Sequence, residues 1–273
     1  MRNYIYFMLF IPLIFYNPCI KAQGNILPMT ELNKQKKFTS VEEALKNKDG
    51  VYILSLSNQS LKSIPDAIFQ LSKIQYLDLR NNQLTTLPKE ILQLKNLQFL
   101  ILSENSLISL PAYIVSLFEL KVLDLASNKL SALPSNFSGL AKLEELSIEN
   151  NRFQKIPIEI CKISTLKTLK IWDNPLVEIP NSICKIEKME ELFINSDQLL
   201  GIIKVESTDT DPKTNSKQCL IDENENSDNS NSGIAVKNGI ANLKKLHIRK
   251  KSISPEQQKA IEKAFKTTKI IYY

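Results

Sequence analysis

The sequence predicts an α/β solenoid: a right-handed horseshoe with a parallel concave β-sheet and short helical, 3-10 or extended segments on its convex side. Apolar residues recur at intervals of 23, at Val51, Ile74, Leu97, Leu120, Leu143, Leu166 and Met189. Prolines recur at the same interval, at Pro65, Pro88, Pro111, Pro134, Pro157 and Pro180. A fixed period of roughly 20 to 50 residues is the signature of stacked repeats. Leucine and isoleucine, 71 of the 273 residues, supply the continuous core that such a stack needs.

The chain begins with a segment typical of an export signal. Residues 4–16 are uncharged and mostly apolar, and Arg2 precedes them. A spanning helix needs about 20 apolar residues, so this shorter run indicates a signal peptide, residues 1–22, cleaved after Ala22. A retained N-terminal anchor and a lipid on Cys19 are the alternatives. We expect an exported protein that is secreted, periplasmic or on the cell surface, with no stable membrane span after cleavage.

Residues 23–50 are expected to be an N-terminal linker followed by a capping helix. The first part, up to Lys37, is polar and rich in lysine. A helix is predicted to follow, with Thr39 or Ser40 as N-cap and Glu42 or Glu43 closing a capping box. This helix is expected to cover the first repeat.

The body of the chain, residues 51–203, repeats one motif. Residues 97–117 have the sequence LQFLILSENSLISLPAYIVSL, and residues 120–140 have LKVLDLASNKLSALPSNFSGL. These segments resemble the 23-residue form of the leucine-rich repeat, LxxLxLxxNxLxxLPxxIxxL, as found in exported bacterial proteins. The resemblance implies a non-catalytic interaction module.

The motif also has a physical explanation. Positions 4 and 6 alternate with polar residues, as in a half-buried strand, so Leu100 and Leu102 are predicted to point inward. The asparagine at position 9, such as Asn105, can both donate to and accept from the unpaired backbone of the turns. Gln59 and Asp197 occupy this position in the first and seventh repeats and are weaker substitutes. Apolar residues at positions 18 and 21 suit one face of a short helical turn.

Two segments follow the array. Residues 204–239 are rich in serine, asparagine and acidic residues, which predicts a disordered acidic insertion. Residues 240–273 are predicted to be a degenerate repeat and C-terminal cap. Ser254 and Pro255 are typical of a helix start, that helix is expected to run to Phe265, and residues 270–273 are expected to add a strand.

Several function classes lack support in the sequence. There is no phosphate-binding glycine loop, no HExxH or CxxC motif, and one histidine, so we expect no enzyme, no cofactor and no metal site. A net charge of +6, mixed along the chain, argues against a nucleic-acid surface. Cys161 and Cys184 occupy the same position in adjacent repeats, so they are either a disulfide or, more simply, two small buried residues. Cys219 is then left unpaired.

The candidate site is the concave face, where positions 3, 5 and 7 point away from the core. Aromatic residues beside charges there are typical of a protein-binding surface. We expect the face to bind a protein or peptide; an alternative is a glycan or cell-envelope ligand stacked on the aromatic rings. A structural role for the aromatic residues is also open, and His247 is expected to be a surface histidine without a role. The candidate residues are Tyr76, Asp78, Arg80, Phe99, Ile101, Asp124, Glu149, Lys170, Trp172 and Phe193.

Overall fold

The computed structural model describes residues 26–177, 183, 186–200, 243–249 and 253–273. The expected signal peptide and the expected acidic insertion lie outside the described residues. Among the described residues, no helix is long and apolar enough to cross a membrane.

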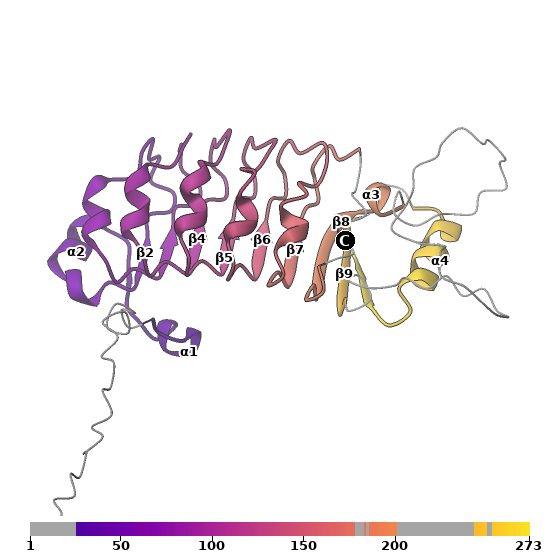
Figure 1. Cartoon of the computed structure of the whole chain (residues 1–273), viewed down its shortest axis with the longest axis horizontal. Coiled ribbons are helices and arrows are strands. Elements are labelled where there is room, and N and C mark those ends of the chain that lie inside the picture. The colour runs from indigo at the N-terminus through magenta and orange to yellow at the C-terminus, as the bar shows by residue number, and fades with distance from the viewer. Residues whose placement is uncertain (1–25, 178–182, 184–185, 201–242, 250–252) are drawn as a thin grey trace, which may run out of the picture.

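Ten parallel strands form one sheet in the described part of the chain, and their spatial order follows the sequence. Figure 1 shows the turns stacked side by side along the long axis. Equivalent residues are paired between neighbouring strands, for example Leu77 with Leu100 and Leu100 with Leu123. The strands are β1 (Lys37–Phe38), β2 (Ile53–Ser55), β3 (Tyr76–Asp78), β4 (Phe99–Ile101), β5 (Val122–Asp124), β6 (Glu145–Ser147), β7 (Thr168–Lys170), β8 (Glu191–Asn195), β9 (Lys245–Arg249) and β10 (Lys269–Tyr272).

Short 3-10 helices return the chain from one strand to the next. The repeated prolines start the first three: Pro65, Pro88 and Pro111 are N-caps in extended conformation, whereas the two shorter helices that follow have Asn136 and Glu159 as N-caps. Proline fixes the backbone at this step and lacks the N–H that a helix start leaves unpaired. The helices are η3 (Asp66–Gln70), η4 (Lys89–Gln93), η5 (Ala112–Ser116), η6 (Phe137–Gly139) and η7 (Ile160–Lys162).

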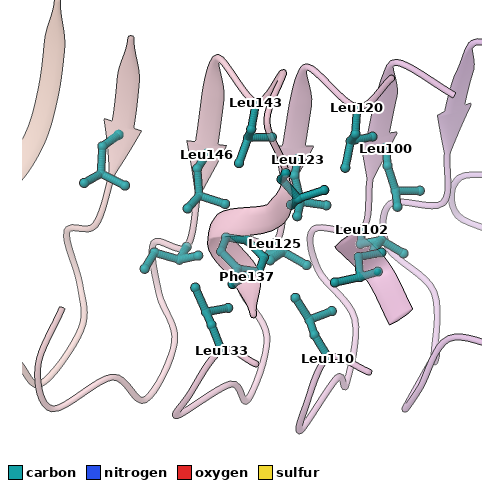
Figure 2. Packing of buried hydrophobic residues seen from close by; sticks show 14 of the residues in the cluster. Leu100, Leu102, Leu110, Leu120, Leu123, Leu125, Leu133, Phe137, Leu143 and Leu146 are labelled. Atoms are coloured by element: carbon teal, nitrogen blue, oxygen red, sulfur yellow. The ribbon is translucent and has the colours of Figure 1, made fainter. Parts of the chain in front are cut away.

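The core is one continuous apolar column. Leu100, Leu123 and Leu146 occupy equivalent places in successive turns and are completely buried (Figure 2). Phe137 of η6 closes the opposite side of its turn (Figure 2). Burying one such side chain contributes about 1.5–3 kcal/mol, but a single turn has no neighbour to bury it against. Stability therefore comes from stacking.

An asparagine ladder satisfies the backbone of the turns, as predicted. Asn105 Nδ2 donates to the carbonyl oxygens of Leu79 and Leu102, each at 3.0 Å. Its Oδ1 accepts from Leu84 N–H at 3.0 Å. Equivalent bonds recur in the other full turns because the period places each asparagine over the preceding turn.

The residue before each ladder asparagine, and before Gln59 in the first repeat, has a left-handed backbone. Its φ lies between 50° and 61° in every turn from Asn58 to Asp173. Asparagine tolerates this conformation, whereas other residues with a Cβ pay about 1–2 kcal/mol for it. Glu104 and Ser127, with φ of 56° and 54°, therefore carry backbone strain.

The N-terminal segment is attached to the sheet. Leu27 N–H donates to Gln75 Oε1 at 3.0 Å, and Gln98 Nε2 donates to Leu27 O at 3.3 Å. Helix α1 (Met29–Leu32) follows, so the linker expected here is in contact with β3 and β4 through two buried glutamines. Helix α2 (Val41–Lys46) has the predicted N-cap, since Ser40 Oγ accepts from Glu43 N–H at 3.4 Å.

The C-terminal end continues the sheet. Strand β9 pairs with β8 in parallel although 54 positions separate Glu191 from its partner Lys245. Helix α4 (Pro255–Ala264) has a capping box between Ser254 and Gln257, and β10 pairs with β9. Asp197, expected to be a weaker substitute at the asparagine position of the seventh repeat, lies in helix α3 (Ser196–Leu200), which directly follows β8.

Candidate functional site

The side chains that alternate with the core residues form the open face of the sheet. Leu77 and Leu79 are completely buried, so their neighbours Tyr76, Asp78 and Arg80 lie on the other side. The register repeats this arrangement in every turn, in three rows at positions 3, 5 and 7. All ten predicted site residues fall on the open face.

An apolar strip occupies the first row at the N-terminal half of this face. It consists of Ile53, Tyr76, Phe99 and Val122, which are neighbours in the strand register and half-buried. The rings of Tyr76 and Phe99 are stacked, with centroids 5.8 Å apart and planes at 29°. Burial, and then the nearby Asp78 carboxylate, raises the pKa of Tyr76. The strip thus offers ring surface beside negative charge.

Two predicted residues beside the strip are buried. Asp78 is 7% exposed; its carboxylate accepts from Arg80 N–H at 3.0 Å and from Ser55 Oγ at 3.2 Å. Ile101, in the same row, is also 7% exposed. Neighbouring side chains cover both residues because strands stand close together in a sheet. A partner therefore meets Tyr76, Phe99 and the exposed Arg80 first.

An acidic centre lies in the middle of the open face and consists of Asp124, Ser147 and Glu149. Asp124 and Ser147 are paired in the register of β5 and β6. Asp124 Oδ1 accepts from Ala126 N–H at 3.0 Å. Burial raises the pKa of Glu149 and the Asp124 charge adds to this, while a hydrogen bond from Trp172 and the charges of Lys170 and Arg249 oppose it. Burial thus outweighs the two cations and the hydrogen bond, and it holds the pKa of the Glu149 carboxyl above its ordinary value.

A C-terminal aromatic cluster consists of Trp172, Phe193, His247 and Tyr273. Trp172 meets Phe193 and Tyr273 edge-on, with centroids 5.2 Å and 5.5 Å away. The His247 ring stacks on Phe193 at 3.8 Å, with planes at 6°. The expectation that His247 is a surface residue was wrong: it is 6% exposed, and burial lowers its pKa.

Charged groups around this cluster are engaged with one another. Arg249 Cζ lies 4.5 Å from the centroid of the Trp172 ring, and Arg249 pairs with Asp173. Lys170 Nζ lies 2.6 Å from Glu145 Oε1 and 5.5 Å from the centroid of the Phe193 ring. One side of each of these two rings thus already holds a cation.

Glu191 joins β8 to β9 through two contacts. Its Oε1 lies 2.5 Å from Lys245 Nζ and its Oε2 lies 3.5 Å from His247 Nε2. The hydrogen bond from Lys245 lowers the pKa of Glu191. On the other side of the imidazole, His247 Nδ1 lies 3.0 Å from Tyr273 Oη. The cluster is therefore fixed by polar contacts as well as by ring stacking.

The sequence analysis placed His247 on the open face without a role, and it missed Arg249 and Tyr273 as parts of this site. The break in the 23-residue period hid them, because their strands follow the long segment after β8. A signal existed in residues 243–248, LKKLHI, which restores the strand pattern and aligns His247 with Phe193.

Clusters of metal ligands and cysteines are sparse in the described part of the chain. Among the residues described, no group of three or more histidine, cysteine or acidic residues is placed to hold a metal ion. Cys161 is buried, with 7% exposed, in η7. Cys184 and Cys219 lie outside the described residues, so the pairing of Cys161 with Cys184 stays a prediction.

Comparisons with known proteins agree on the fold. Residues 44–154 match the family model described as "Leucine-rich repeat region". No curated protein matches the chain. Among solved structures, the chain is similar to a leucine-rich-repeat protein of Leptospira interrogans, with 24% identity, a TM-score of 0.52, and coverage of 88% of this chain and 70% of that one.

Two further structures are similar. An internalin C2 from Listeria monocytogenes has 21% identity and a TM-score of 0.55, with 84% of each chain covered. A plant peptide hormone receptor, RGFR1 in complex with RGF2, has 23% identity and a TM-score of 0.50, with 81% of this chain and 32% of the receptor covered. At these identities the likeness concerns the fold.

Proposed function

This chain is a leucine-rich-repeat solenoid protein, and from that premise we propose that it is an exported, non-catalytic module that binds a protein or peptide on the concave, open face of its sheet. The observation that carries the proposal is the pair Tyr76 and Phe99. Their rings stack with each other on the open face, opposite the apolar core, and the fold needs no aromatic side chain there. Aromatic residues in such places are typical binding hot spots.

The plant receptor in the comparison gives this proposal support by analogy. It is a peptide hormone receptor solved in complex with RGF2, and its repeats have the same fold as this chain. Because one fold hosts many functions, the analogy gives the type of surface and not the partner. Export is proposed from the apolar run at residues 4–16, which lies outside the described residues.

The geometry gives less support to a glycan ligand. A sugar stacks on the open face of an aromatic ring, yet Arg249 covers one face of Trp172, and His247 covers one face of Phe193. The cluster is arranged to hold β9 and β10 on the sheet. We therefore place the first partner contacts on the apolar strip and the acidic centre.

A peptide-display selection tests the proposed function. Random 12-residue peptides are selected on the immobilised wild-type protein and then screened against two variants, Phe99→Ser and Phe118→Ser. Phe118 is 67% exposed in the turn between η5 and β5, so its change matches that of Phe99 in chemistry but lies off the open face. We expect the selected peptides to bind the Phe118→Ser protein as they bind the wild type, and to lose their affinity for the Phe99→Ser protein. Peptides that bind the Phe99→Ser protein as well as the wild type, or a glycan-array signal that depends on Phe99, would contradict the proposal.

A further inference from the structure

We propose that the acidic centre binds a cationic side chain, lysine or arginine, of the protein or peptide partner. The inference rests on the proposed function and deepens it, because it assigns a chemical class to one part of the partner. It predicts a basic residue next to the apolar residue that contacts Tyr76 and Phe99.

Two oxygen atoms of the acidic centre are buried without a hydrogen-bond partner. They are Ser147 Oγ and Glu149 Oε2, and the Ser147 residue is only 4% exposed. Buried polar atoms of this kind are rare in native proteins and cost about 1–3 kcal/mol each. Both side chains belong to the open face, so we infer that donors from a bound ligand complete their hydrogen bonding.

The Ser147 side chain is directed to the open face. Its neighbours Leu146 and Ile148 are buried in the core, and side chains alternate along a strand. The register places Ser147 between Asp124 and Lys170. The hydroxyl thus lies in the same row as the Asp124 carboxylate, and Ser147 precedes Glu149 by two residues on the same face.

The electrostatics select a cation. Burial and the Asp124 charge raise the pKa of Glu149, whereas the charges of Lys170 and Arg249 lower it, so the cations offset only part of the cost of the buried carboxylate. The nearest cations are already engaged, since Lys170 pairs with Glu145 and Arg249 pairs with Asp173. An additional ammonium or guanidinium group would offset more of this cost and donate to the carboxylates and to Ser147 Oγ.

The surroundings favour a side chain over a free metal ion. Lysine and arginine carry aliphatic stems that pack on apolar surface while the charged end binds polar groups. The strip with Phe99 and Val122 lies on one side of the acidic centre, and Trp172 lies on the other. Two carboxylates and one hydroxyl are also fewer ligands than the six to eight oxygens, roughly, that calcium prefers.

The test uses a peptide selected on the wild-type protein, with binding followed by the emission of Trp172, the single tryptophan of the chain. Replacing the basic residue of the peptide by citrulline or norleucine is expected to weaken binding by about tenfold or more. Glu149→Gln and Ser147→Ala are each expected to weaken the binding of the original peptide and to leave the binding of the neutral peptide nearly unchanged. Glu90→Gln, an exposed site on η4, is the control for the same charge change and is expected to bind as wild type.

Three results would overturn the inference. The first is a set of peptides that require Phe99 but contain no basic residue, or whose affinity changes less than about twofold when their basic residue is neutralised. This result leaves the proposed function standing and contradicts the cation site. Calcium chloride alone, if it shifts Trp172 emission and competes with the peptide, assigns the acidic centre to a metal. A selection without any peptide that depends on Phe99 contradicts both the inference and the proposed function. Thermal melts of each variant confirm that a loss of binding is not a loss of fold.

Discussion

The asparagine ladder leads to a quantitative prediction for Asn105→Ala. The change leaves the N–H of Leu84 without its partner, in a turn where Asn105 is 9% exposed. It also removes one of two donors from the carbonyl oxygens of Leu79 and Leu102, which keep the side-chain amides of Asn82 and Asn128. An unsatisfied buried group costs about 1–3 kcal/mol, and each lost hydrogen bond to a carbonyl that keeps a second donor costs about 0.5–1.5 kcal/mol. We expect the free energy of unfolding to fall by about 2–4 kcal/mol, in the lower half of that sum, because water enters part of the space.

Asn96→Ala is the matched control. Asn96 is also in a turn of the array, but it makes one exposed hydrogen bond, from Nδ2 to Ser72 O at 2.8 Å. Its loss is expected to cost less than about 1 kcal/mol. Equilibrium urea unfolding, followed by circular dichroism, measures both variants. Equal shifts of the unfolding midpoint for the two variants would refute the assignment of the ladder as a main source of stability.

Three further predictions concern strain and titration. Glu104→Gly removes the strain of a left-handed backbone and is expected to raise stability by about 1 kcal/mol in urea unfolding; a loss would contradict the strain. Burial lowers the pKa of His247, so the stability that the neutral imidazole contributes is full above its ordinary pKa of 6.5 and is lost as the pH falls below that value. His247→Phe is expected to make Tm less dependent on pH in this range, and a pH profile of Tm equal to that of the wild type would contradict this cause. Burial raises the pKa of Glu149, so the ionised carboxylate costs stability at pH values above its ordinary pKa of 4.5. Glu149→Gln is therefore expected to raise Tm at pH 7, and the gain in Tm is expected to shrink as the pH falls. A gain in Tm that is the same at every pH would be inconsistent with this cause.

The repeated elements could be predicted because local chemistry determines them. The alternation around Leu100 and Leu102, the donor and acceptor pair of Asn105, and the repeated prolines each have one structural solution, and the solution recurs every 23 residues. The helix starts at Ser40 and Ser254 were also predictable, since a cap depends on neighbouring residues.

The parts of the site that were missed depend on contacts between distant segments. The returning pattern at residues 243–248 indicates another strand, but the burial of His247 comes from its stacking on Phe193 once β9 pairs with β8, and the pattern does not give that contact. The low exposure of Asp78 and Ile101 likewise comes from side chains on neighbouring strands. The open face could be predicted from the alternation alone, whereas the exposure of each residue on it could not.

The affinity of a selected peptide for Phe99→Ser, compared with Phe118→Ser, tests the central claim most directly. The dissociation constants can be measured by isothermal titration calorimetry, which does not depend on where the peptide binds. Binding on the open face predicts that Phe99→Ser weakens the affinity by about tenfold or more, while Phe118→Ser leaves it unchanged. Wild-type affinity for Phe99→Ser together with a loss for Phe118→Ser would contradict a binding site on the open face.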